Sequence, residues 1–460
     1  MSMNKLHWGQ ALQGRLGDKQ ALWDGVASQA GQYAPRLAKE LAAGTLPFIN
    51  MPYLTALKTE LPKVMAKFGI GPDGELKHLL LLGIGGSALG PRALQKAFMP
   101  QQDWPGYDAS GPHLWIADNV DAASLDAWLD KLPPKETLVV VISKSGGTIE
   151  TMAQYLLVRE WLCRALGEDW TKHVLAITDE KQGALRQECD EKGLASLPVP
   201  DHLGGRYSVL SAVGMVPAYF CGMDWKALLA GAAAVTAPLA ANPQSLGNHP
   251  AWRLACWAKA LLDANYSQLI FFSYIPAWAC FGSWFCQLWA ESLGKAGQGS
   301  MPLPAVGVTD QHSLLQMFLD GPKDKGCLFL ESGGLPLGRA FGMDAVNPLP
   351  KQWAYLMGQR FGHLLAAEGV GTLGAMAAQQ VPLVRLNMEK TDEAAAGSLI
   401  ALLEMATVFT GWLLGIDPLD QPAVEYGKRL ANARLGAPGY AEEQAALDKY
   451  FALPDEEQVF

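Results

Sequence analysis

The feature that most constrains this fold is the stretch TLVVVISKSGGTIETM at residues 137–152. It opens with an uncharged run, residues 138–142, whose β-branched side chains are typical of a strand buried on both faces of a parallel sheet. A turn rich in glycine and hydroxyl groups follows, and apolar residues from Met152 onward recur with helical periodicity. The sequence therefore predicts a strand, a tight turn and a helix N-terminus in direct succession.

Such a turn is suited to holding an anion. The first N–H groups of a helix lack intrahelical partners and carry the positive end of its dipole. Ser143, Ser145 and Thr148 add hydroxyl donors, Lys144 lies among them, and two glycines let the backbone close on a ligand. Serine and threonine are also ordinary N-cap residues, so a capped helix in a plain connection is the alternative. Three hydroxyls exceed what one cap requires, which favours a phosphate site.

Composition narrows the class of protein. At 460 residues the chain is longer than one typical core, which predicts two or three domains. Half of the residues are hydrophobic, and the net charge of -9 argues against nucleic acid or an anionic membrane as the main partner. The 7 cysteines include no CxxC pair, which favours a reduced, cytoplasmic protein with neither a disulfide framework nor a zinc cage.

One uncharged segment, residues 269–290, is long enough to suggest a membrane span. Pro276 interrupts it, however, and Glu291 follows at once. We therefore predict a buried strand over 269–273, a turn at Pro276 and a buried helix from about Trp278, and no membrane partner. The N-terminal residues are polar and lack the apolar region of a signal peptide.

Strand-like runs alternate with helix-length segments, which predicts an α/β protein with doubly wound parallel sheets. The predicted strands are residues 79–82, 114–117, 138–142, 174–178, 269–273, 327–331 and 383–387. We expect two α/β units of similar size, with helical segments at both ends of the chain. The expected parts are an N-terminal helical segment (1–60), a first α/β domain (61–235), a second α/β domain (236–435) and a C-terminal helical tail (436–460).

A second glycine-rich turn, GIGGSALG at residues 83–90, follows the predicted strand at 79–82. It matches the loose dinucleotide fingerprint, so a nicotinamide-dependent dehydrogenase is one reading. The acidic residue at the end of the next strand, Asp118, lies beyond the usual spacing for that fingerprint. The turn, with Gly86 and Ser87, serves equally well as the second wall of a sugar-phosphate pocket.

Four other residues carry possible acid–base chemistry, each with a plainer alternative. Arg206 in GGRYS could neutralise an oxyanion or a phosphate, or could be a surface arginine. Glu291 follows a large apolar stretch where a carboxylate tends to be desolvated, which suits a general base, although a helix end in solvent fits as well. His312 in VTDQHS could shuttle a proton or merely stand near a helix start. Lys428 would ordinarily lie on a solvated helix face.

Taken in order, six motifs resemble those of the phosphoglucose isomerase (glucose-6-phosphate isomerase) family in its shorter bacterial form. They are GIGGSxLGP, SKSGGTxET, GGRYSxxSAVG, ESxGK, TDxHS and QPxVExxK, and the resemblance covers about residues 79–430. The resemblance implies two sugar-isomerase (SIS-type) α/β domains with peripheral helices and a homodimer. It also implies reversible isomerisation of glucose 6-phosphate and fructose 6-phosphate through a cis-enediol, in glycolysis and gluconeogenesis.

The resemblance also implies roles for individual residues. By matching positions, Glu291 resembles the base that moves a proton between C2 and C1, and Arg206 the group that stabilises the enediolate. His312 and Lys428 match the residues that open the sugar ring, and His312 is expected to reach into the neighbouring subunit's pocket. No metal or redox cofactor is implied. The substrate wall matches at Gly86, Ser87, Ser143, Lys144, Ser145, Thr148, Gly205, Gln287 and Gln421.

The sequence departs from the family pattern in three places. Gly147 stands where a second threonine is common, Leu293 replaces the asparagine of ESNGK, and His312 lies in VTDQHS in place of TxGQHS. A non-catalytic sugar-phosphate sensor of the same fold is the rival reading, because such regulators keep the phosphate loop and lack the base. Glu291, His312 and Lys428 together favour the enzyme, and no basic DNA-binding region accompanies them.

Overall fold

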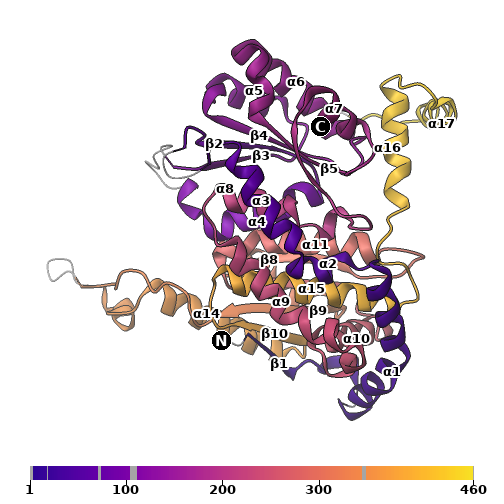
Figure 1. Cartoon of the computed structure of the whole chain (residues 1–460). Helices are drawn as coiled ribbons and strands as arrows, with labels where there is room; N and C mark the ends of the chain where they lie inside the picture. Colours follow the sequence, from indigo (N-terminus) through magenta and orange to yellow (C-terminus); the bar gives the residue numbers. More distant parts are fainter. Residues whose placement is uncertain (1–3, 18, 71–73, 104–110, 344–348, 459–460) are drawn as a thin grey trace.

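Two five-stranded sheets form the framework of the chain, one in each lobe of Figure 1. The computed structural model describes residues 4–17, 19–70, 74–103, 111–343 and 349–458. The described strands are β1 (Lys5–Gln10), β2 (His78–Leu82), β3 (His113–Ala117), β4 (Thr137–Ile142), β5 (Val174–Thr178), β6 (Ala195–Pro198), β7 (Gln268–Ser273), β8 (Met301–Val306), β9 (Lys325–Ser332) and β10 (Leu383–Met388). The described α-helices are α1 (Lys19–Ala43), α2 (Pro47–Asn50), α3 (Thr55–Ala66), α4 (Gly86–Phe98), α5 (Ala122–Lys131), α6 (Ile149–Leu166), α7 (Ala184–Lys192), α8 (Ala212–Phe220), α9 (Trp225–Ala241), α10 (Pro250–Asp263), α11 (Ala279–Leu293), α12 (Thr309–Ser313), α13 (Leu315–Leu319), α14 (Phe361–Ala378), α15 (Glu393–Leu413), α16 (Ala423–Arg434) and α17 (Ala441–Phe451). The predicted α/β class is confirmed.

The first sheet is entirely parallel, with strand order β3-β2-β4-β5-β6. Every residue of β2, β4 and β5 is buried, as their uncharged apolar runs predicted. The edge strand β6 was not predicted, because its sequence ASLP carries a short apolar signal and ends in proline. Proline is tolerated at a sheet edge, where one side of the strand needs no partner.

The helices that follow β2 and β4 lie on opposite faces of this sheet. α4 packs against α8 and α11, whereas Tyr155, Val158 and Leu162 of α6 pack in the separate core on the other face. Leu82 lies opposite Val141 in parallel register, so the two strands end side by side. In open α/β sheets, a crevice forms where the helices after two adjacent strands lie on opposite faces of the sheet. Ligands bind in this crevice, at the carboxyl ends of the strands.

The second sheet has strand order β1-β10-β9-β7-β8, and β1 runs antiparallel to β10 at its edge. The prediction that residues 1–60 are a helical segment is therefore wrong at Lys5–Gln10. The sequence KLHWGQ alternates exposed and partly buried residues, as an edge strand does, and its polar composition concealed it. β8 was also missed, because Pro302 and Pro304 interrupt an edge strand that tolerates them.

The two lobes share their largest hydrophobic core. It holds Leu79 and Val140 from the first sheet and Phe271 and Val384 from the second, together with buried residues of the helices between them. Each sheet has a smaller core on its other face. A continuous layer of helices therefore joins the sheets, and a domain boundary near residue 235 stays a prediction.

The uncharged segment 269–290 forms β7, a short helical turn at Pro276–Trp278 and most of α11, as predicted. Within the described residues, one helix, α15, is long and apolar enough to cross a membrane. However, 83% of its apolar window is buried inside the protein, where α15 packs against α9 and α10. A buried core helix passes the same test of length and composition, so α15 is weak evidence for a membrane span.

α15 also contains a carboxyl group with no exposed surface, that of Glu404. Among the described residues, neither of its oxygens has a hydrogen-bond partner. Burial raises the pKa of Glu404 well above its ordinary value of 4.5. Burial therefore favours the neutral, protonated form of this group in the folded protein.

Replacing Glu404 with leucine should stabilise the protein by an amount that grows with pH. Above pH 4.5 the unfolded chain releases the Glu404 proton while the folded chain keeps it, so the wild type loses stability as pH rises. The difference between variant and wild type should widen by up to about 1.4 kcal/mol per pH unit. Urea unfolding at several values from about pH 5 to about pH 8 measures it. A difference that does not change with pH would contradict a protonated Glu404.

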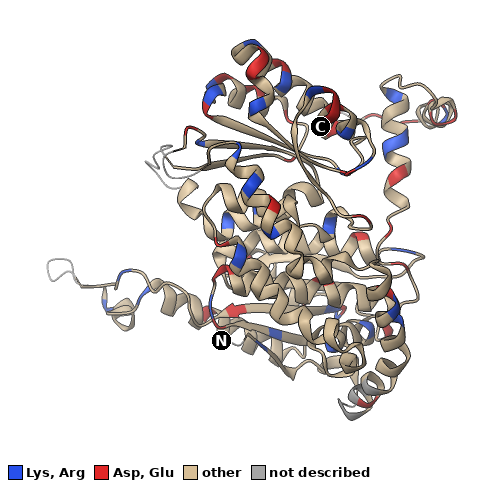
Figure 2. Cartoon of the chain, viewed as in Figure 1, with Lys and Arg blue, Asp and Glu red and all other residues tan. Residues whose placement is uncertain are grey.

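The C-terminal helices α16 and α17 form a pair on one side of the molecule, yellow in Figure 1. Most residues of α16 are exposed, and Arg429 of α16 forms an ion pair with the buried Glu443 of α17. α17 lies within the helical tail predicted over 436–460, of which the last two residues lie outside the described part. Charged side chains of both signs are interspersed over the outer helices in Figure 2.

Candidate functional site

A cavity of about 950 Å³ opens at the carboxyl ends of the first-sheet strands. Turns after β2 and β4 line it on the first lobe, and α11 with residues 419–428 lines it from the remaining sides. Except for His312, every residue that the sequence predicted for the site lies in its lining. These residues are Gly86, Ser87, Ser143, Lys144, Ser145, Thr148, Gly205, Arg206, Gln287, Glu291, Gln421 and Lys428.

The turn after β2 forms one wall of the cavity. Gly85 stands at the N-cap of α4 with φ +56°, a conformation that glycine adopts readily. A Cβ on Gly86 would lie 2.2 Å from the carbonyl carbon of Gly205, so the two backbones touch here. The glycines of this turn therefore bring the start of α4 against the segment that carries Arg206.

The turn after β4 forms the neighbouring wall. Thr148 stands at the N-cap of α6, but its side chain makes no capping hydrogen bond. Its hydroxyl accepts instead from the hydroxyl of the buried Ser143 at 3.4 Å. Ser145 is exposed and lines the cavity beside Thr148. Thr148 therefore stands at the position of an ordinary helix-capping residue, as the alternative interpretation predicts. Its hydroxyl, however, does not cap the helix.

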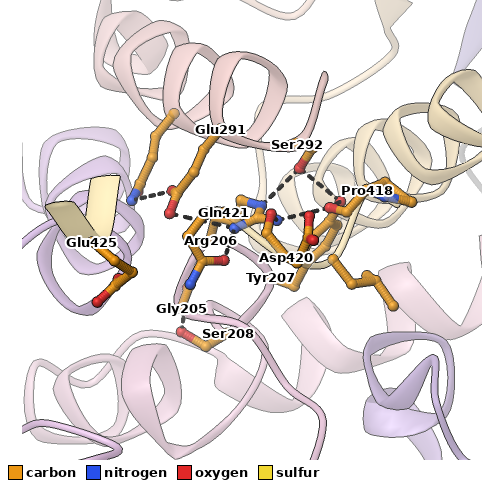
Figure 3. Close-up of polar contacts among 12 residues, drawn as sticks. Gly205, Arg206, Tyr207, Ser208, Glu291, Ser292, Pro418, Asp420, Gln421 and Glu425 are labelled. Atoms are coloured by element: carbon orange, nitrogen blue, oxygen red, sulfur yellow. Dashed lines mark hydrogen bonds and ion pairs between the residues drawn. The ribbon is translucent and has the colours of Figure 1, made fainter. Parts of the chain in front are cut away.

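Arg206 is buried beside the cavity, with 2% of its surface exposed. Its Nη1 donates to Oε1 of Gln421 at 2.9 Å and lies 3.3 Å from Oε1 of Glu291 (Figure 3). Its other N–H groups donate to Ser292 and to two backbone carbonyls of residues 418–420. The guanidinium is therefore a fixed cation, and the reading of Arg206 as a surface residue is wrong.

Glu291 lies in the last turn of α11, with its side chain partly exposed to the cavity. One carboxyl oxygen faces Arg206, and the other accepts from Nε2 of Gln287, one turn earlier, at 3.0 Å. Among the described residues, the remaining polar atom of Gln287, its buried Oε1, has no partner. The site thus presents an oriented carboxylate beside a fixed cation.

Three positively charged side chains line the cavity. Lys144 donates to the carbonyl of Leu203 at 3.2 Å, which ties the phosphate turn to the loop before Arg206. Lys428 lies on α16 and forms an exposed ion pair with Glu425 at 2.7 Å. An anionic ligand would therefore meet Lys144, Arg206 and Lys428 from separate elements of the chain.

The structure adds lining residues that the sequence analysis did not single out. Asp179 directly follows β5 at the same sheet edge as the two turns, and that position alone could have identified it. Backbone N–H groups of Lys181 and Gln182 lower the pKa of the Asp179 carboxyl. The full set of additions with charged or polar side chains is Glu150, Asp179, Gln182 and His202.

His312 is exposed on the short helix α12, which follows β8, and does not line the cavity of its own chain. It is the one predicted site residue that the fold of a single chain leaves apart from the rest.

Asp118, the acidic residue considered for a dinucleotide site, forms an ion pair with Arg92 of α4 at 2.8 Å. It does not line the cavity. The carboxylate that would have held a ribose hydroxyl is thus engaged by a neighbouring helix, which counts against the dehydrogenase reading.

Comparison with known proteins gives the same family from independent sources. A family model described as phosphoglucose isomerase matches residues 52–327. The chain is 40% identical to the glucose-6-phosphate isomerase of Rubrobacter xylanophilus over 366 residues, which cover 78% of this chain and 82% of that protein. It is 31% identical to the glucose-6-phosphate isomerase of Carboxydothermus hydrogenoformans over 448 residues, which cover 95% and 94% of the two chains.

Solved structures share the fold. A hypothetical protein from Thermus thermophilus aligns with a TM-score of 0.79 and 30% identity, over 94% of this chain and 100% of that one. A glucose-6-phosphate isomerase from Chlamydia trachomatis aligns with a TM-score of 0.73 and 22% identity, over 95% and 90% of the two chains. The second likeness shows the fold alone.

Proposed function

This chain belongs to the phosphoglucose isomerase family, and we propose that the cavity described above is where it interconverts glucose 6-phosphate and fructose 6-phosphate. The reaction follows from family membership, and it is a step of glycolysis. It moves a hydrogen between C2 and C1, so it requires a base, an oxyanion stabiliser and an open-chain sugar. The observation that carries the assignment is the 3.3 Å contact between Glu291 and Arg206 at the cavity wall.

In this proposal the sugar phosphate binds with its phosphate at the turn after β4. The first N–H groups of α6 and the hydroxyls of Ser145 and Thr148 are the donors. Ser143 holds Thr148 in place through its 3.4 Å hydrogen bond. Ser87, at the start of α4, contributes a hydroxyl from the adjacent wall, and Lys144 lends positive charge.

Glu291 is then the base that takes the proton from one carbon and returns it to the other. Its carboxylate is held by Arg206 and Gln287 from two sides, which restricts its rotation. As the enediolate forms, negative charge develops on the sugar oxygens, and the Arg206 guanidinium lies beside the base to stabilise it.

Ring opening requires a proton donor and acceptor near the ring oxygen, a role we assign to Lys428 and His312. Lys428 reaches the cavity from α16 of the same chain, whereas His312 does not line it. We therefore place the partner's His312 in this cavity, in a cytoplasmic homodimer that shares its active sites. A non-catalytic sensor would have no use for the paired Glu291 and Arg206, and the relatives named above are enzymes.

A coupled assay for fructose 6-phosphate tests the function directly. The purified chain should convert glucose 6-phosphate in a first incubation without nucleotide, and the coupling enzymes with their nucleotides are added only after this incubation has been stopped. Binding of glucose 6-phosphate without any turnover would leave the sensor reading in place and overturn the enzyme.

The phosphate site makes a separate prediction for Ser145→Ala combined with Thr148→Ala. The double variant should bind glucose 6-phosphate less tightly by about 10-fold or more, since two hydroxyl donors to a charged group are lost. Inorganic phosphate should compete with substrate in the wild type and much less in the variant. Ser124 is partly exposed, and its hydroxyl donates to Asp121 outside the cavity, so it offers a matched serine-to-alanine control. Unchanged inhibition by phosphate would place the anion elsewhere, with the region of Arg206 as the next candidate.

A further inference from the structure

Four hydrogen bonds and one ion pair hold the Arg206 guanidinium. Nε donates to Oγ of Ser292 at 2.7 Å, and Nη1 faces Gln421 and Glu291. Nη2 donates to the backbone carbonyls of Pro418 at 2.7 Å and Asp420 at 2.9 Å (Figure 3). A guanidinium presents its donors in a rigid planar fork, so these acceptors together determine one orientation.

Two hydroxyl groups connect this fork into a ring. The Tyr207 hydroxyl lies 2.9 Å from Oγ of Ser292 and 3.2 Å from the carbonyl oxygen of Pro418. That carbonyl only accepts, and Ser292 already accepts from Arg206. Both hydroxyl protons are used within the ring when Ser292 donates to Tyr207 and Tyr207 donates to Pro418. The ring then runs from Arg206 through Ser292, Tyr207 and Pro418 back to Arg206, with every proton assigned.

The ring is closed to solvent. Tyr207 has 1% of its surface exposed and Ser292 has 0%. Burial raises the pKa of the Tyr207 hydroxyl to about 12, so this hydroxyl keeps its proton and remains a donor at neutral pH. The Tyr207 ring stacks on Phe48 of α2, with 5.1 Å between centroids, which limits its movement.

We propose that Tyr207 and Ser292 are positioning residues for the isomerase reaction. They set the angle of the Arg206 guanidinium and, through its Nη1, the separation between that cation and the base Glu291. Glu291 and Ser292 are consecutive on α11, and Arg206 and Tyr207 are consecutive in the segment after β6. The ring therefore fixes the register between the two elements that carry the base and the oxyanion stabiliser. This inference rests on the roles proposed above for Glu291 and Arg206.

The test compares Tyr207→Phe and Ser292→Ala with the wild type in the intact enzyme. Tyr207→Phe keeps the stacking on Phe48 and removes only the hydroxyl. Each variant should lower kcat by about 10- to 100-fold, because small misplacement of catalytic groups has effects of that size, with KM changed less than about 3-fold. The double variant should be no slower than the slower single variant by more than about 3-fold, since either change opens the same ring.

Two remote residues offer matched controls. Tyr33 donates its hydroxyl to the carbonyl of Trp412, and Ser398 donates to the carbonyl of Gly231, both outside the ring. Tyr33→Phe and Ser398→Ala should keep kcat within about 2-fold of the wild type, because they remove comparable hydrogen bonds without contacting Arg206. Ser292→Thr retains a hydroxyl and should recover activity lost in Ser292→Ala.

Wild-type kcat in both ring variants would overturn the inference, as would losses that multiply in the double variant. A loss matched by equal changes in the two controls would assign the effect to general stability, and would also overturn it. Glu291→Gln run in parallel separates this result from the proposed function. If that variant keeps its activity, the base assignment fails, whereas normal ring variants beside an inactive Glu291→Gln reject only the positioning role.

Discussion

Glu291→Gln should lower turnover by roughly 10²-fold or more while changing substrate binding little. The amide has nearly the shape of the carboxylate, so the cavity and the contact with Gln287 can persist. It cannot take up the proton from the substrate carbon, and it no longer balances the charge of Arg206 at 3.3 Å. The coupled assay gives turnover, and exchange of the C2 hydrogen with solvent measures the proton transfer by itself.

The matched control is Glu160→Gln, which changes an exposed carboxylate of α6 paired with Arg164. It should leave both measurements unchanged, because surface ion pairs contribute little. Exchange of the C2 hydrogen at the wild-type rate in Glu291→Gln would rule out Glu291 as the base. Circular dichroism shows whether Glu291→Gln is folded. If it is unfolded, Glu291→Asp takes its place as the test variant, because aspartate keeps the acid and moves it away from the substrate.

Mixing two inactive variants should restore activity if the active site is shared between subunits. Glu291→Gln and His312→Ala homodimers should each be strongly impaired. When they are unfolded and refolded together at equal concentration, a mixed dimer has one doubly altered site and one intact site. Random pairing makes about half of the dimers mixed, so about a quarter of all sites should recover. The exposure of His312 outside its own cavity motivates the experiment.

Each variant refolded alone is the control for this experiment, and wild type refolded in the same way sets the scale. Size-exclusion chromatography establishes that dimers have formed. If both groups acted within one chain, every site would keep one lesion and the mixture would stay inactive. Verified mixed dimers without activity would therefore assign His312 to its own subunit.

Much of the site could be predicted because its chemistry lies in short segments at strand ends. Each of β2 and β4 is an apolar strand followed by a turn with glycine and hydroxyl groups. Because the two strands are neighbours in a parallel sheet, their turns lie side by side at its carboxyl edge. Glu291 could be placed because the uncharged segment before it had to be buried. At these positions the local sequence pattern and the burial imposed by the folded protein favour the same structure.

Other features depend on contacts that no local pattern contains. Three of the acceptors that hold Arg206 come from residues 418–421, which are remote in sequence, and two of these three are backbone carbonyls. Ser292 and Tyr207 lie within recognisable motifs, but their mutual hydrogen bond follows only from the docking of two elements. β1 was missed for the same reason, since its polar sequence becomes a strand only beside β10.

The pairing of β1 with β10 sets an order for folding during synthesis. The strands of the first sheet all lie between His78 and Pro198, so that sheet can form while the rest of the chain is still being made. Lys5 must wait for Asn387, its partner across the second sheet. At ~5–20 residues per second the ribosome needs roughly 20–80 seconds to bridge that separation. β1 is thus synthesised before the other described strands and is among the last of them to be paired. Until β10 has been made, β1 has no partner strand, and we expect the lysine, histidine and glutamine side chains of this polar edge segment to oppose its pairing with other chains.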